Sequence, residues 1–96
     1  MTGLTPAPGG TGSPATNEVF IQGMSFSPAT ISVAAGTTIT WTNKDAVAHT
    51  VTSSTGAFDS GSIAANGTWS FTFTVAGTYN YACSFHPSMT GKVVVN

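Results

Sequence analysis

The sequence predicts an all-β protein built as a sandwich of two sheets. Short runs rich in Val, Ile, Thr, Phe, Tyr and Trp follow one another, and Gly, Pro and Asn interrupt them at short intervals. No stretch shows the i, i+3, i+4, i+7 spacing of a long amphipathic helix. The 96 residues suffice for one compact domain with a single core. Short strands with regular turns in a chain of this size indicate sheets packed face to face.

The first sixteen residues differ in composition from the rest. They are rich in Pro, Gly, Thr and Ser and offer almost nothing to bury, so we expect residues 1–16 to form a flexible tether. Met1 directly before this segment suggests that an export leader or a lipid-anchored start has been removed. The folded domain is therefore expected at residues 17–96.

Seven strands are expected in that domain: Glu18–Gln22, Thr30–Val33, Thr37–Asn43, His49–Ser53, Thr68–Val75, Gly77–Cys83 and Lys92–Val95. Alternation is clearest in two of them. One strand places Trp69, Phe71, Phe73 and Val75 on a single face, and the other does the same with Tyr79, Tyr81 and Cys83.

Composition excludes several classes of function. The chain has two Lys or Arg and three Asp or Glu residues, a formal net charge of −1, which is too neutral for nucleic-acid binding. No apolar run approaches the roughly 20 residues that cross a bilayer. We also expect the protein to be a monomer. Thr, Ser, Asn and Gly supply the hydrophilicity, a balance typical of periplasmic or other extracytoplasmic β-rich domains. The single cysteine rules out an internal disulfide.

One motif brings together side chains that bind soft metals. Thiol, imidazole and thioether recur at three-residue intervals as Cys83-x-x-His86-x-x-Met89, and a tight loop can point all three at one centre. The other histidine, His49, begins a different expected strand. Two histidines, one cysteine and one methionine form the ligand set of a trigonal copper site with a weak axial thioether. The sequence therefore predicts one Cu(I)/Cu(II) ion and electron transfer, not an enzyme.

The segment from Asn17 to Asn96 resembles the cupredoxins of the plastocyanin, pseudoazurin and amicyanin group. The shared landmarks are Phe26-Ser27-Pro28, Gly36 to Asn43, Asp45, Ala48-His49-Thr50-Val51, the ligand loop and Gly91 to Val95; the loop spacing is most like amicyanin. The resemblance implies a Greek-key sandwich of about seven to eight strands. It also implies that His49, Cys83 and His86 bind copper in a plane, with Met89 on the axis.

Two residues depart from the family pattern. Thr50 stands where Asn is usual and Phe85 where Pro is frequent. By analogy, the Thr50 N–H hydrogen-bonds the Cys83 sulfur and its hydroxyl bridges to the Ser84 region, while Phe85 keeps an N–H that can reach the thiolate. Hydrogen bonds to the sulfur favour Cu(I), so we expect a raised reduction potential.

The resemblance also implies that His86 is the electron port. An apolar ring is expected around it from Phe85, Pro87, Ala46, Val47 and Met24, where redox partner proteins would dock. The low charge favours recognition by contact over electrostatic steering.

Other interpretations remain open. Taken singly, a buried cysteine or methionine is more often part of a core than a ligand. Cys83 could act as a nucleophile activated by histidine, with Asp59 orienting the base, although Asp45 and Asp59 are expected to be turn residues. Copper storage or delivery without redox turnover is a further alternative, and an immunoglobulin-like adhesion module is another. Two-site copper enzymes would need more histidines than this chain has.

Overall fold

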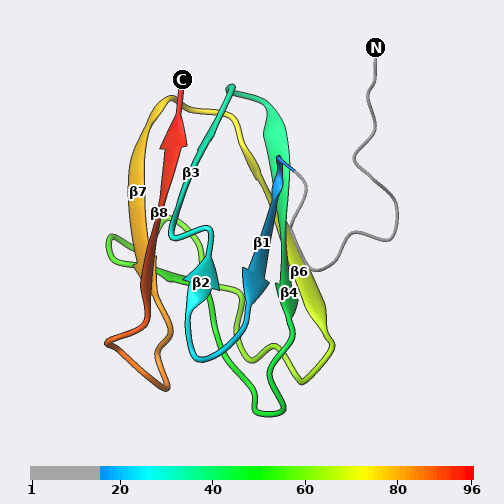
Figure 1. The fold of residues 1–96 in the computed structure, drawn as a ribbon. Helices are drawn as coiled ribbons and strands as arrows, with labels where there is room; N and C mark the ends of the chain where they lie inside the picture. The colour runs from blue at the N-terminus through cyan, green and yellow to red at the C-terminus, as the bar shows by residue number, and fades with distance from the viewer. Residues whose placement is uncertain (1–15) are drawn as a thin grey trace.

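Alternating apolar and polar residues produce most of the strands in the computed structural model, which describes residues 16–96 (Figure 1). The strands are β1 (Glu18–Ile21), β2 (Phe26–Ser27), β3 (Thr30–Val33), β4 (Thr37–Asn43), β5 (Thr52–Ser53), β6 (Thr68–Phe73), β7 (Gly77–Ala82) and β8 (Thr90–Val95). All but one of them, β2, fall within or across strands expected from the sequence. β2 has only two residues, which is too short to show any period.

The strands form two four-stranded sheets, in the orders β2-β1-β4-β6 and β3-β8-β7-β5. β1 pairs with β4 and β3 pairs with β8 in parallel, and the remaining neighbours are antiparallel. Figure 1 shows the two sheets facing each other. The predicted all-β sandwich is therefore confirmed.

The pairing of β4 with β6 shows how the sequence pattern determines which side faces the core. On the outer face, Thr38 lies opposite Thr72 and Thr40 opposite Ser70, and the two hydroxyl pairs are hydrogen-bonded at 2.7 and 2.8 Å. The alternate β6 residues Trp69, Phe71 and Phe73 pack against the core, as predicted. Val75 was expected to join them, but β6 ends at Phe73 and Val75 is 66% exposed.

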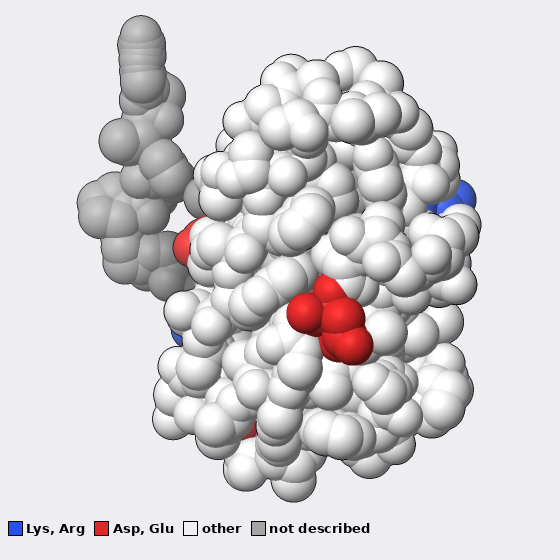
Figure 2. All heavy atoms as spheres, turned by 180° about the vertical axis from the view of Figure 1, so that it is seen from behind, with Lys and Arg blue, Asp and Glu red and all other residues white. Residues whose placement is uncertain are grey.

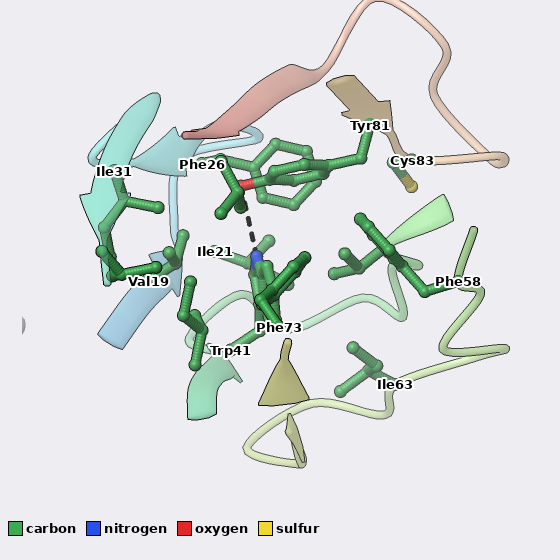
Figure 3. Packing of buried hydrophobic residues seen from close by; sticks show 14 of the residues in the cluster. Val19, Ile21, Phe26, Ile31, Trp41, Phe58, Ile63, Phe73, Tyr81 and Cys83 are labelled. Carbon is green, nitrogen blue, oxygen red and sulfur yellow. Dashed lines mark hydrogen bonds between the residues drawn. The ribbon is translucent and has the colours of Figure 1, made fainter. Parts of the chain in front are cut away.

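The core is centred on aromatic rings contributed by both sheets. Trp41 of β4 is fully buried and its ring lies 5.7 Å from that of Tyr81 on β7 and 5.3 Å from that of Trp69 on β6. Figure 3 shows Cys83 at the margin of this cluster, just beyond the end of β7. The core therefore carries the cysteine at one of its ends.

The expected strand His49–Ser53 is mostly absent, since only Thr52–Ser53 is a strand. His49 forms an isolated antiparallel bridge with Ile63. The next two backbone donors bond to side chains, because Thr50 N–H points to the Cys83 sulfur and Val51 N–H to the Ser60 hydroxyl. A sheet ladder cannot form where these donors are diverted.

Two connections meet at one end of the sandwich and hold the predicted ligands. The segment after β4 carries His49, and the segment between β7 and β8 carries Cys83, His86 and Met89. Both lie at the lower end in Figure 1. The predicted linker, residues 1–16, falls almost entirely outside the described residues. In residues 16–96, no helix has the length and apolar character needed to span a membrane.

Candidate metal centre

The backbone of the ligand loop explains why the three-residue spacing matters. His86 N–H donates to the carbonyl of Cys83 at 3.2 Å, and Met89 N–H donates to the carbonyl of His86 at 2.8 Å. Cys83 N–H donates to the carbonyl of Met89 at 3.0 Å, which closes the loop. The three predicted ligands are thus joined by their own backbones, in two consecutive turns. This compact loop restricts where their side chains can point.

A buried asparagine stabilises the loop that carries His49, the fourth predicted ligand. Asn43, the last residue of β4, is fully buried, and its side-chain amide donates to the carbonyls of Val47 and Ile63 at 2.8 and 2.9 Å. Its side-chain oxygen accepts the N–H of Asp45 at 2.9 Å. These bonds fix the segment before His49, which is itself fully buried.

The structure brings His49 and Cys83 together at a distance that suits a shared metal ion. Nδ1 of His49 lies 3.7 Å from Sγ of Cys83, and both residues are fully buried. In protein zinc sites a nitrogen ligand lies about 2.0 Å and a thiolate about 2.3 Å from the ion. At angles between tetrahedral and trigonal, these bond lengths separate the two donors by about 3.5 to 3.7 Å. One ion can therefore bind both atoms without moving either.

His86 and Met89 lie beside this pair. The imidazole rings of His49 and His86 are 5.4 Å apart between centroids, at an interplanar angle of 62°. Met89 is buried in the same cluster as Cys83. Among residues 16–96, no three His, Cys, Asp and Glu side chains are already arranged to hold a metal. The predicted set is completed by the thioether of Met89, and the imidazole of His86 is partly exposed.

Backbone hydrogen bonds stabilise the Cys83 thiolate. Thr50 N–H donates to Sγ at 3.3 Å, as the resemblance implies. Desolvation by burial raises the pKa of the Cys83 thiol, but backbone hydrogen bonds, from Thr50 first and then from Phe85 and His86, help to hold the pKa below its usual value. A thiolate is the form that binds metal, so the loop prepares Cys83 for this role.

A chain of hydroxyl groups connects the two loops. Thr50 Oγ1 accepts the N–H of Ser84 at 2.7 Å and lies 2.8 Å from the Ser84 hydroxyl, as expected for the residue that stands in place of Asn. Thr52 Oγ1 lies 3.0 Å from Thr50 Oγ1 and donates to Asp59 Oδ1 at 3.1 Å. The Thr50 side chain therefore holds the segment after His49 against the segment after Cys83.

Asp45 contacts His49, a relationship between the two side chains that the sequence pattern does not show. Oδ2 of Asp45 lies 2.9 Å from Nε2 of His49. Desolvation by burial raises the Asp45 pKa, but hydrogen bonds from the backbone of Met24 and Gly23 and from His49 hold it below its ordinary value. The sequence marks Asp45 as a turn residue and as one of the family landmarks, and its place four residues before a candidate ligand is a further signal of this contact.

The nucleophile hypothesis does not match these positions. Asp59, which it required as the orienting group, bonds to Thr52 and to the N–H of Gly61, whereas Asp45 is the carboxylate on His49. Cys83 is fully buried, so a substrate would have no direct access to its sulfur. The Asp59 assignment is therefore wrong, and its contact with Gly61 is that of a turn residue.

An all-β sandwich with a buried cysteine and histidine at one end defines the class of protein as a cupredoxin. The chain belongs to the family described as "Cupredoxin-like domain", whose sequence pattern matches residues 5–95. The predicted family is confirmed.

Within this family the chain is similar to the amicyanins. It is 38% identical to amicyanin-alpha of Methylorubrum extorquens over 85 residues, which cover 83% of this chain and 71% of the relative. It is 40% identical to amicyanin of Paracoccus denitrificans over 84 residues, which cover 80% of this chain and 63% of the relative. The chain thus matches less than two thirds of the second relative's length.

Solved structures give the same result. A mutant of amicyanin in its oxidized state superposes with a TM-score of 0.79 at 37% identity, covering 82% of this chain and 80% of the other. A purple cupredoxin from Nitrosopumilus maritimus superposes with a TM-score of 0.76 at 31% identity, covering 82% and 98%. The amicyanin-like fold is therefore confirmed.

Proposed function

We propose that the chain transfers single electrons through one type 1 copper ion held by His49, Cys83, His86 and Met89. The observation that carries this proposal is the 3.7 Å separation of His49 Nδ1 and Cys83 Sγ in a chain similar to the amicyanins. The amicyanin relatives confirm the predicted class, an amicyanin-like type 1 copper electron carrier and not an enzyme. The choice of the four ligands is our proposal.

The residues around the ligands favour transfer with little rearrangement. When bound, copper supplies a one-electron couple between Cu(I) and Cu(II). Asn43 and the bonds within the ligand loop hold the backbone on either side of the site, and Thr50 fixes the two segments to each other. Loops fixed in this way keep the donor atoms in place in both oxidation states.

Redox proteins are the proposed partners, and an apolar surface near His86 is the proposed contact. Phe85, Val47 and Met24 are 53%, 50% and 44% exposed, and Pro87 and Ala46 are exposed as well. Gathered in one patch, such side chains would form an interaction surface. Figure 2 shows a face of the molecule with very few charged side chains. Contact between apolar surfaces is therefore favoured over charge steering.

We also propose a periplasmic or other extracytoplasmic location. The amicyanin relatives and the composition rich in Thr, Ser, Asn and Gly support it. The membrane tether predicted from residues 1–16 remains a prediction. Cell fractionation of the full-length gene product tests both, and recovery in the cytoplasmic fraction would contradict them.

Addition of Cu(II) to the metal-free protein tests the function. We expect one equivalent to produce an intense visible band that a mild reductant bleaches and a mild oxidant restores. Cys83→Ser should abolish the band, and Met89→Gln should keep a band with changed intensity and potential. Met24→Gln is the matched control, because Met24 is exposed and outside the proposed set. Binding without reversible bleaching would favour storage or delivery instead.

A further inference from the structure

The turn between β1 and β2 donates two backbone hydrogen bonds to the carboxylate of Asp45, which is distant from it in the sequence. Gly23 N–H donates to Oδ1 at 2.8 Å, and Met24 N–H donates to Oδ2 at 3.0 Å. Both residues have positive φ, 63° and 59°, and their two successive N–H groups meet the same carboxylate. Successive N–H groups arranged in this way form a concavity that binds anions.

The same carboxylate also contacts the imidazole of His49. Oδ2 lies 2.9 Å from Nε2, and a carboxylate can only accept hydrogen bonds, so Nε2 carries a proton. Nδ1, which faces the Cys83 sulfur at 3.7 Å, is then the nitrogen free to bind a metal in the neutral ring. One side chain thus determines which nitrogen of His49 is available.

We propose that Asp45 is a positioning residue that selects the Nδ1-binding form of His49 and lowers the reduction potential of the copper site. Carboxylates on the outer nitrogen of metal-bound histidines fix the tautomer and make the ring a stronger electron donor. Stronger donation stabilises Cu(II) relative to Cu(I). This proposal rests on the proposed function for the potential, whereas the tautomer does not depend on copper.

Asp45 opposes the effect of the hydrogen bonds to the sulfur. Thr50 N–H at the Cys83 sulfur favours Cu(I), and the carboxylate at His49 favours Cu(II). The side chain of Asp45 is only 16% exposed, so solvent screens its interaction with the fully buried imidazole less than at an open surface. In this proposal two opposing interactions tune the reduction potential: the hydrogen bond to the sulfur of Cys83 and the carboxylate at His49.

The first test uses the metal-free protein labelled with ¹⁵N. At a pH where the ring is neutral, the chemical shifts of the His49 nitrogens in wild type should show a proton on Nε2 and none on Nδ1. In Asp45→Ala the population of the Nδ1–H form should rise. A predominantly Nδ1–H ring in wild type, or an unchanged tautomer ratio in Asp45→Ala, would overturn the assignment.

The second test uses the copper-loaded protein. Asp45→Asn keeps the shape of the side chain and removes its charge, and we expect the ratio of Cu(I) to Cu(II) at a fixed potential to rise about tenfold, which is about 59 mV for one electron. Copper affinity should fall by about 10 to 100-fold in Asp45→Ala. Glu18→Gln removes the same charge at the start of β1, away from the site, and controls for general electrostatics.

The outcomes separate this inference from the function. An Asp45→Asn potential equal to that of Glu18→Gln, in a protein that turns blue normally, would refute the role of Asp45 and leave the copper site intact. A wild type that never develops the visible band would refute the proposed function, while the nitrogen shifts would still decide the tautomer.

Discussion

The indole N–H of Trp41 donates a hydrogen bond of 3.2 Å to the hydroxyl of Tyr81, joining the two sheets through the core (Figure 3). Trp41 lies on β4 in one sheet and Tyr81 on β7 in the other. The two rings meet edge to face, at 89° and 5.7 Å between centroids. Because Cys83 follows Tyr81 by two residues, this contact also fixes the strand that leads into the ligand loop.

Stability should fall at alkaline pH because of Tyr81. Desolvation by burial raises the pKa of its phenol from 10.0 to about 12. The neutral phenol is therefore favoured by folding, and its contribution is complete below pH 10 and lost as the pH rises toward about 12. Two pH units correspond to about 2 to 3 kcal/mol. Urea unfolding across this range should show the decline.

Two phenylalanine variants test that assignment. Tyr81→Phe should remove this decline of stability at alkaline pH. It should also lower the free energy of unfolding at neutral pH by about 1 to 3 kcal/mol, because the buried Trp41 N–H loses its acceptor. Tyr79→Phe, which alters a half-buried tyrosine on the same strand, should retain the loss. A full alkaline decline in Tyr81→Phe would contradict the prediction.

Gly91 should not tolerate a side chain. It lies opposite Tyr81 in the β7–β8 pair, and a Cβ added there would lie 2.8 Å from Cε2 of Tyr81 and still closer to its Cζ and hydroxyl. Gly91→Ala should lower the free energy of unfolding by about 1 to 3 kcal/mol, because the packed ring has to shift. Thr90→Ala is the control, because Thr90 is next to Gly91 and exposed, and it should lower the free energy of unfolding far less. Gly77→Ala would not serve, because the φ of Gly77 is positive.

The hydroxyl of Thr50 should matter more than that of a surface threonine. Thr50→Val keeps the N–H that bonds the Cys83 sulfur but leaves the Ser84 N–H without its acceptor, so unfolding free energy should drop by about 1 to 3 kcal/mol. Thr72→Val removes an exposed hydroxyl that bonds Thr38 and should cost less than about 1 kcal/mol. Equal losses in thermal or urea unfolding would argue against a special role for Thr50.

Phe85→Pro should lower the reduction potential. Proline lacks the N–H that helps to hold down the pKa of the Cys83 thiol, so Cu(I) becomes less favoured. In the metal-free protein, ultraviolet titration of the thiolate should show a higher Cys83 pKa. Phe85→Ala retains the N–H and serves as the control. If the reduction potential of Phe85→Pro does not fall below that of Phe85→Ala, the proposed effect of the Phe85 N–H on the potential is contradicted.

The class of fold was predictable because each strand is marked by a regular alternation of residues within a short stretch of sequence. Alternation in Thr68–Phe73 and the turn residues around it mark a half-buried strand without any knowledge of its neighbours. Val75 was misplaced because nothing in the local pattern shows where β6 ends. The strand expected at His49 was mostly absent because two of its backbone donors bond to the Cys83 sulfur and the Ser60 hydroxyl, partners that are distant in the sequence.

The sequence by itself determined the class of fold, the spacing of the soft donors and the scarcity of charge, since these depend on residue types and short intervals. Only the tertiary structure decided which nitrogen of His49 faces the sulfur and which aspartate lies behind the ring. Asp45 is bound by Gly23 and Met24, and Cys83 by Thr50, across long separations in the chain. Contacts of that kind arise from the pairing of β1 with β4 and of β5 with β7, strands that are far apart in the chain, and no local pattern encodes which strands pair.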